Sequence, residues 1–92
     1  MGLYFEWDSH KAISNFKKHK ISFEEACTIF NDQRSITILD PDHSHDEVRE
    51  ITIGVSRNMM ILVVSHTDRL GRVRIISARK ANKKEQKQYL EI

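Results

Sequence analysis

Positive charge gathers in the last third of this sequence, with few acids to balance it. Residues 69–87 hold eight of the fifteen Lys and Arg residues and one acid, Glu85, whereas the rest of the chain holds seven basic and twelve acidic residues. Lys83 and Lys84 stand where a polar helix is expected to begin, at the end whose dipole favours anions. This pattern indicates either ordinary solvated surface or a site whose missing anion belongs to a ligand. Apolar residues interrupt the segment, so we expect it to be folded and to form the surface for any nucleic acid.

The composition excludes several classes of protein and of site. With 92 residues, of which 39% are hydrophobic and 30% charged, the chain is expected to form a single domain over residues 1–92. Its longest apolar run, residues 59–64, is far shorter than the ~20 residues of a membrane span. No signal-peptide pattern precedes Trp7. Cys27 is the single cysteine, which excludes an internal disulfide and a Cys-based metal site. We therefore expect a cytoplasmic protein.

A short histidine motif invites a metal interpretation. His43 and His45 lie two residues apart among acids, and such a pair on an extended segment can share a metal ion. Polar loops with scattered histidines are common, however. We expect no metal and no cofactor.

Local signals predict two helices after a short strand at residues 3–7. Asp8 is a good N-cap for a helix that ends near Lys18. Residues 22–25, Ser-Phe-Glu-Glu, have the pattern of a capping box. Apolar residues then recur at i, i+3, i+4 and i+7, which predicts a second helix that ends at Asn31-Asp32: Phe23, Ala26, Cys27 and Phe30.

The second half of the chain has the pattern of strands. Short links between them favour antiparallel hairpins, and a capping box at residues 82–85 starts a C-terminal helix. The order is therefore β-α-α-β-β-β-β-α, an α+β domain with a mostly antiparallel sheet and helices packed on one face. The expected strands are residues 36–39, 48–55, 60–66 and 72–79.

Several short segments, taken in order, resemble one protein family. They are Phe5-Glu6-Trp7-Asp8, Lys11-Ala12, Asn15, Lys18-His19, residues 21–26, Glu47-x-Arg49, Gly54, residues 62–64 with His66-Thr67, and residues 74–81 with Glu85 and Tyr89. This set resembles the BrnT family, toxins of bacterial type II toxin–antitoxin pairs. The resemblance implies a RelE-like fold, a ribonuclease activity that arrests translation, and a BrnA-type antitoxin that supplies the binding to operator DNA. One departure is Lys20, where the family commonly has the Gly that suits a left-handed helix end.

Four residues are candidates for the chemistry that the resemblance implies. RNA cleavage without a metal needs a base for the 2′-OH, cations for the phosphorane and an acid for the leaving oxygen. We expect His66 to transfer a proton, since its ordinary pKa is about 6.5, and Arg49 and Arg79 to bind the phosphate. Glu47, two residues before Arg49, is a weaker candidate for the base. The alternatives are that His66 is a hydrogen-bonded strand histidine without a catalytic role, and that Glu47 and Arg49 form a surface ion pair.

Five further residues are expected to contact RNA: Arg74, Lys80, Lys83, Lys84 and Tyr89. Strict alternation along the strand puts Arg74 on the face opposite Arg79, so we favour Arg79 for the cleaved phosphate. Tyr89 would stack on a base or donate a proton, although a helix Tyr more often packs. Composition alone leaves two other functions open: a non-catalytic nucleic-acid-binding module, or a protein-interaction module that uses residues 69–87.

Overall fold

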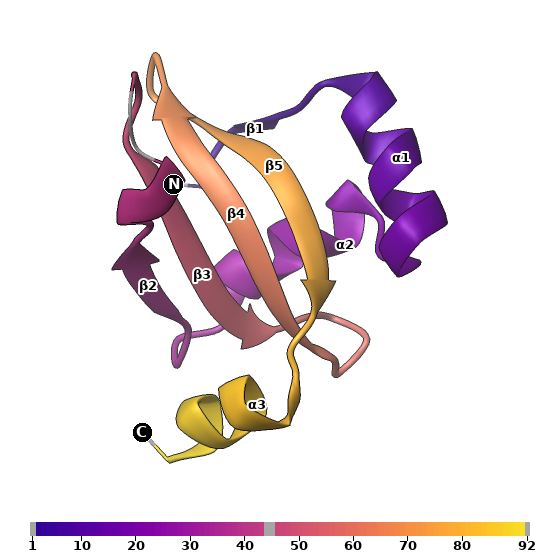
Figure 1. The fold of residues 1–92 in the computed structure, drawn as a ribbon, viewed down its shortest axis with the longest axis vertical. Helices are drawn as coiled ribbons and strands as arrows, with labels where there is room; N and C mark the ends of the chain where they lie inside the picture. Colours follow the sequence, from indigo (N-terminus) through magenta and orange to yellow (C-terminus); the bar gives the residue numbers. More distant parts are fainter. Residues whose placement is uncertain (1, 44–45, 92) are drawn as a thin grey trace.

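A short strand and two α-helices come first, four further strands complete a five-stranded sheet, and a third α-helix follows (Figure 1). The computed structural model describes residues 2–43 and 46–91. The predicted α+β class and order of elements are confirmed. The elements are β1 (Phe5–Glu6), α1 (Ser9–His19), α2 (Phe23–Cys27), the 3-10 helix η1 (Thr28–Asn31), β2 (Ile36–Leu39), the 3-10 helix η2 (Pro41–His43), β3 (Arg49–Val55), β4 (Ile61–Arg69), β5 (Arg72–Lys80) and α3 (Lys83–Leu90).

The sheet is mixed, with the strand order β1-β5-β4-β3-β2. Three of its four strand pairs are antiparallel, as predicted, whereas the short β1 runs parallel to β5. The β4–β5 hairpin turns at Leu70 and Gly71, whose φ angles of 54° and 80° are both positive. Two positive φ angles match the twist of the flanking strands, which fixes the register of the hairpin.

A side-chain cap begins α1, and a residue in the left-handed conformation ends it. Asp8 Oδ1 accepts hydrogen bonds from the backbone N–H groups of His10 (2.8 Å) and Lys11 (3.2 Å), as the sequence predicts. The helix ends at Lys20, whose φ of 61° is left-handed. Lysine therefore takes up the conformation that glycine adopts more easily. Within the described residues, no helix is both long and apolar enough to cross a membrane.

The second helix is shorter than predicted. Ser22 Oγ accepts a hydrogen bond from the N–H of Glu25 (3.0 Å), which is half of the expected capping box. The Glu25 carboxylate is instead bound by Ser56 Oγ (2.7 Å) of the β3–β4 link. After Cys27 the chain tightens into the 3-10 turn η1, a common way for a helix to end.

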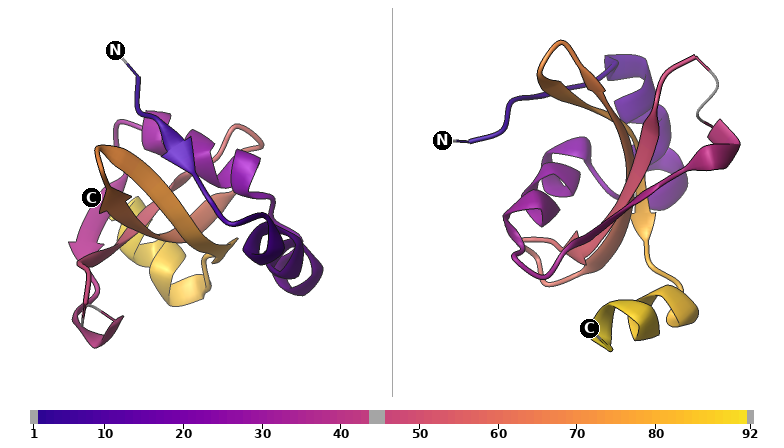
Figure 2. Two further views of the ribbon diagram at one scale, coloured as in Figure 1. Left: turned by 90° about the horizontal axis from the view of Figure 1, so that it is seen from above. Right: turned by 90° about the vertical axis from the view of Figure 1, so that its left-hand side faces the viewer.

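Helices lie on both faces of the sheet, which corrects the prediction that they pack on one face. Phe23 and Ile29, from α2 and η1, pack against Leu62 of β4. Tyr89 of α3 packs against Val63, on the other side of the same strand, because successive side chains of a strand alternate. Figure 2 shows the sheet edge-on, with α2 on one side and α3 on the other. We call the face toward α3 and η2 the open face, since α3 covers only one end of it.

A β-bulge interrupts the pairing of β4 with β5. Ser65 pairs with Ser77, but the next residue of β4, His66, pairs with Ile75. Ile76 is therefore an extra residue in β5, and strict alternation fails at that point.

The bulge places Arg74 and Arg79 on the same face of the sheet. Arg79 pairs with Val63, and Arg74 pairs with Thr67. Side chains directly opposite one another share a face, and Val63 and Thr67 are four residues apart along one strand. Both arginines consequently lie on the open face, which corrects the prediction that they lie on opposite faces.

Candidate functional site

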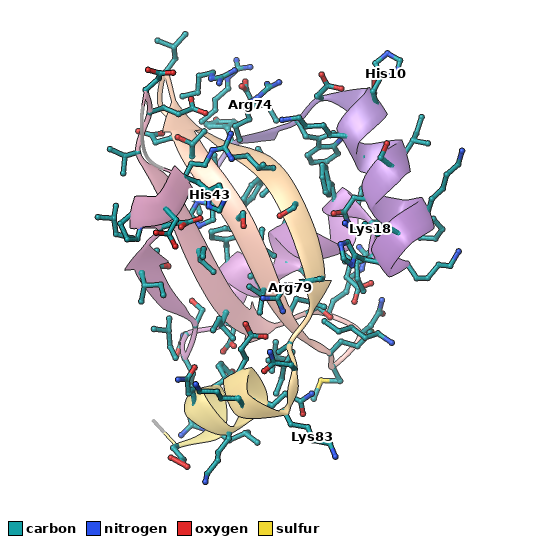
Figure 3. All side chains as sticks on the ribbon, viewed as in Figure 1. His10, Lys18, His43, Arg74, Arg79 and Lys83 are labelled. Atoms are coloured by element: carbon teal, nitrogen blue, oxygen red, sulfur yellow. The ribbon has the colours of Figure 1, made fainter. Side chains whose placement is uncertain are left out.

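A small pocket lies on the open face, beyond the end that α3 covers. Its volume is about 160 Å³. Arg49, Ser65 and Ser77 reach it from three neighbouring strands, because β3, β4 and β5 each turn one of these side chains to the same face. Asp40 and His43 close it from the η2 turn, and Ile76 of the bulge completes its lining. Figure 3 shows His43, Arg74 and Arg79 in front of the sheet.

Asp40 orients His43 at the edge of this pocket. The Nδ1 atom of His43 lies 2.9 Å from Asp40 Oδ2, and the Asp40 N–H donates to the carbonyl of Arg49 (2.8 Å). An ionised carboxylate only accepts, so Nδ1 carries the hydrogen and Nε2 is left as the basic nitrogen. The His43 side chain is 64% exposed, whereas that of Asp40 is 14% exposed. The pair is therefore an oriented histidine within reach of a ligand.

The sequence-based candidates did not include this pair, because His43 was considered only as a metal ligand. Its partner in that reading, His45, lies outside the described residues. Among residues 2–43 and 46–91, no three His, Cys, Asp or Glu side chains gather closely enough to hold a metal ion. The usable signal was the Asp-Pro-Asp-His run at residues 40–43, since one tight turn brings its first and last side chains together.

Glu47 and Arg49 lie together on the open face, with Arg69 as a third member. Glu47 Oε2 accepts a hydrogen bond from Arg69 Nη2 (3.0 Å), and Glu47 Oε1 lies 3.9 Å from Arg49 Nε. The Arg69 hydrogen bond lowers the pKa of Glu47. A carboxylate of lower pKa is a weaker base, so this geometry disfavours Glu47 as the proton acceptor. Arg74, further along the face, donates to Glu6 Oε2 (3.1 Å).

Arg79 holds the start of α3. Its Nη1 and Nη2 donate to the two carboxylate oxygens of Glu85 (2.7 and 2.8 Å). Glu85 also accepts the N–H of Asn82 (2.9 Å), which completes the predicted capping box. These hydrogen bonds raise the pKa of Arg79 and lower that of Glu85. Because the guanidinium fork is occupied, a phosphate would have to displace Glu85 to use it.

Lys80, Lys83 and Lys84 are exposed around this helix start. Figure 3 shows Lys83 at the end of the molecule that carries α3. These lysines are solvated cations beside a capped helix. The carboxylate of Glu85, in the first turn of α3, supplies negative charge of the kind that a helix N-terminus favours.

His66 and Tyr89 are buried, and the side chain of each forms a hydrogen bond within the protein. His66 points to the face opposite the pocket, where Nε2 lies 2.7 Å from Thr52 Oγ1 and the ring meets Phe30 edge-on at 5.0 Å. Burial lowers the pKa of His66. The Tyr89 hydroxyl donates to Asp32 Oδ2, and the ring belongs to the core beneath α3. Neither side chain can reach a ligand on the open face in this conformation.

A family model and a solved structure match this chain. The family model described as "Ribonuclease toxin, BrnT, of type II toxin-antitoxin system" matches residues 7–85. A search of curated proteins finds no match. The 1.1 Å crystal structure of the Brucella abortus ribonuclease toxin BrnT matches with a TM-score of 0.65 and 20% sequence identity, over 89% of this chain and 100% of that one. At this identity the likeness shows a shared fold.

Proposed function

The chain belongs to the BrnT family of ribonuclease toxins of type II toxin–antitoxin systems, and from this premise we propose that its open face cleaves RNA without a metal ion. The pocket that carries the proposal brings His43, held by Asp40, beside Arg49 and the hydroxyls of Ser65 and Ser77. A proton acceptor and a cation are two of the three groups that metal-free phosphodiester cleavage needs, and water serves as the third, the acid for the leaving oxygen.

In this proposal His43 is the general base. Its Nε2 takes the proton of a 2′-OH, and the 2′-oxygen attacks the adjacent phosphorus. The bond from phosphorus to the 5′-oxygen then breaks, and water protonates that oxygen. The products are a 2′,3′-cyclic phosphate and a 5′-hydroxyl end. Asp40 stabilises the imidazolium that forms, and Arg49 stabilises the negative charge of the phosphorane.

The other residues that the sequence predicted have no catalytic role in this proposal. Arg74 shares the open face and extends its positive surface toward β1. Arg79 is assigned to holding α3, and His66 to the core, because the contacts of both are made within the protein. Flanking phosphates are expected to meet the exposed lysines beyond Arg79: Lys80, Lys83 and Lys84.

No step of the proposed cleavage mechanism uses a metal ion. The charge that a metal would neutralise in the transition state falls to Arg49, which does not deprotonate. The described residues also offer no cluster of three metal-ligating side chains.

We further propose that a BrnA-type antitoxin neutralises the toxin in the cytoplasm and supplies the contact with operator DNA. The type II family supports an antitoxin partner. The RelE-like class is likewise a proposal, supported by two N-terminal helices that precede an antiparallel run of strands.

The test is cleavage of RNA by purified protein carrying His43→Ala, Asp40→Asn or Arg49→Lys. We expect His43→Ala and Arg49→Lys each to slow single-turnover cleavage by at least ~10²-fold, because a proton acceptor or a preorganised two-donor cation is lost. Asp40→Asn should slow it less, since the imidazole stays in place.

Arg57→Lys is the matched control for Arg49→Lys, since Arg57 is exposed in the β3–β4 link, at the other end of β3. It should cleave like the parent. Unchanged melting temperatures would show that all variants fold. Parental cleavage by a folded His43→Ala protein would remove His43 from the mechanism, and RNA binding without cleavage by the parent would favour a non-catalytic module.

A further inference from the structure

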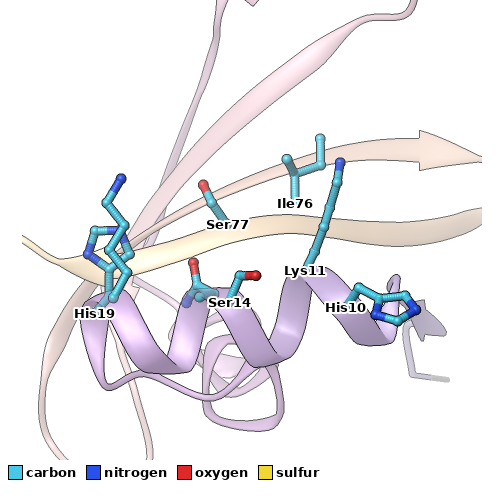
Figure 4. Close-up of a pocket in the computed structure, with 8 residues that line it drawn as sticks. His10, Lys11, Ser14, His19, Ile76 and Ser77 are labelled. Atoms are coloured by element: carbon cyan, nitrogen blue, oxygen red, sulfur yellow. The ribbon is translucent and has the colours of Figure 1, made fainter.

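A second and larger cavity lies between α1 and the outer edge of β5. Its volume is about 400 Å³, and the lining of this α1–β5 groove comes from one face of the helix and from β5. Lys11, Ser14 and Lys18 follow at i, i+3 and i+7, the spacing that puts side chains on one helix face. Figure 4 shows Lys11 extending along Ile76, with Ser14 and His19 further along the same side.

The groove carries the positive charge of two lysines, and Asp8, which caps α1, lies beside His10 at one end of it. Two lysines and two histidines, His10 and His19, contribute to its lining, and no described Asp or Glu does. α1 itself has no acidic residue. Among the described residues, Arg49, Arg74 and Arg79 of the open face form ion pairs, whereas Lys11 and Lys18 form none. A basic groove of this kind matches the phosphate backbone of a nucleic acid.

Hydrogen bonds of Asn15 hold the floor of the groove together. Asn15 Nδ2 donates to the carbonyls of Ile21 (3.0 Å) and Ala78 (2.9 Å), and its Oδ1 accepts the N–H of Ala78 (3.1 Å). These hydrogen bonds hold α1 against β5 and set where the backbone of Lys11 and Lys18 lies relative to the strand.

The groove and the pocket on the open face meet at the β-bulge. Ile76 and Ser77 line both cavities. β1 pairs with β5 only at Val73 and Arg74, so among the described residues no strand covers the edge of β5 beside the bulge. One nucleic-acid strand can therefore pass from the pocket, over this edge, into the groove.

We propose that the α1–β5 groove is a second RNA subsite, which binds the phosphodiester next to the one that is cleaved. The inference rests on the proposed ribonuclease site. Lys11 and Lys18 bind the phosphate as point charges, and the imidazoles of His10 and His19 supply flat surfaces and N–H donors for the adjoining nucleotide. Lysine contacts of this kind bind RNA without selecting a base.

The experiment compares a groove variant, Lys11→Gln/Lys18→Gln, with a control variant, Lys17→Gln/Lys20→Gln. Both remove two lysines from the same end of the chain, but Lys17 and Lys20 do not line the groove. Cleavage is measured on a dinucleotide, which contains only the cleaved phosphate, and on a longer oligonucleotide.

The groove variant should cleave the dinucleotide at the parental rate and raise KM for the longer RNA by about tenfold. The slope that describes the salt dependence of binding to the longer RNA should fall by about one unit, because the contacts to one phosphate are lost. The control variant should match the parent in both measurements. Equal defects on both substrates, or a groove variant that behaves like the control, would overturn the subsite.

Binding of the longer RNA separates this inference from the proposed function. If the parent cleaves neither RNA, the cleavage mechanism fails, while a smaller salt slope in the groove variant still supports the subsite. If the groove variant binds RNA like the parent but loses affinity for the antitoxin, the groove is a protein interface and the subsite is wrong.

Discussion

Asn15 pairs with both backbone groups of Ala78, as a neighbouring strand would. Its amide donates to the Ala78 carbonyl and accepts the Ala78 N–H, at 2.9 and 3.1 Å. The bond joins residues 63 positions apart in the chain and closes the edge of β5 just beyond the bulge. Buried backbone groups need such partners, so this side chain connects α1 to the sheet.

Asn15→Asp should destabilise the protein strongly. A carboxylate cannot donate to the carbonyls of Ile21 and Ala78, and two buried acceptors would lose their partner at a cost of roughly 2–4 kcal/mol in the free energy of unfolding. Urea unfolding followed by circular dichroism measures the change. Asn58→Asp, the same substitution at an exposed turn position, should change it little. Equal effects of the two substitutions would contradict the role given to Asn15.

Arg79 and Glu85 should behave as one structural unit. Arg79→Lys and Glu85→Gln each break the two-bond pair that holds the start of α3. We expect each to lower stability by about 1 kcal/mol, since the pair is partly exposed. Single-turnover RNA cleavage should stay within about threefold of the parent in both variants.

This pair of variants also tests the catalytic role that the sequence predicted for Arg79. If Arg79→Lys slows cleavage by ~10²-fold or more while Glu85→Gln does not, the guanidinium acts on the RNA and the structural assignment is wrong.

Stability should decline as the pH falls below the ordinary pKa of histidine, because burial lowers the pKa of His66. The unfolded chain takes up a proton at His66 below about pH 6.5, whereas the folded protein keeps the ring neutral beside Thr52. The contribution of neutral His66 to the free energy of unfolding is therefore complete above about pH 6.5 and is lost as the pH falls toward the pKa of His66 in the folded protein. Urea unfolding between neutral and mildly acidic pH should show a flatter profile for His66→Gln than for the parent. Parallel profiles would contradict this assignment.

RNA cleavage should persist in excess EDTA. The proposed mechanism uses Arg49 and the His43–Asp40 pair, so removal of divalent cations should leave the single-turnover rate within about twofold. Cleavage is measured after dialysis against EDTA and again after Zn²⁺ or Mn²⁺ is added. Loss in EDTA followed by recovery on metal addition would establish a metal-dependent reaction instead.

Lys83→Ala/Lys84→Ala should lower the salt dependence of RNA binding by about one unit for each phosphate contact that is lost. Both side chains are exposed at the start of α3. Fluorescence anisotropy at several salt concentrations measures the slope. A slope equal to that of the parent would show that these lysines are solvated surface, the other interpretation of the basic segment.

The order of helices and strands was predictable from the sequence, because its signals are local. Asp8 and Asn82 cap the helices that follow them, and each does so through a backbone group within three residues. The family was also recognisable from short segments in order, and the match over residues 7–85 confirms it.

The positions of the candidate site residues were decided only by the tertiary structure. One extra residue, Ile76, moves Arg74 to the face of Arg79, and a bulge depends on the partner strand as well as on its own sequence. His66 is buried because η1 places Phe30 over it, and Arg79 is engaged because α3 brings Glu85 back to β5. The groove beside α1 exists because Asn15 holds a helix against a strand end far away in the chain. These contacts join distant segments, so side-chain periodicity, which reports only on near neighbours, could not reveal them.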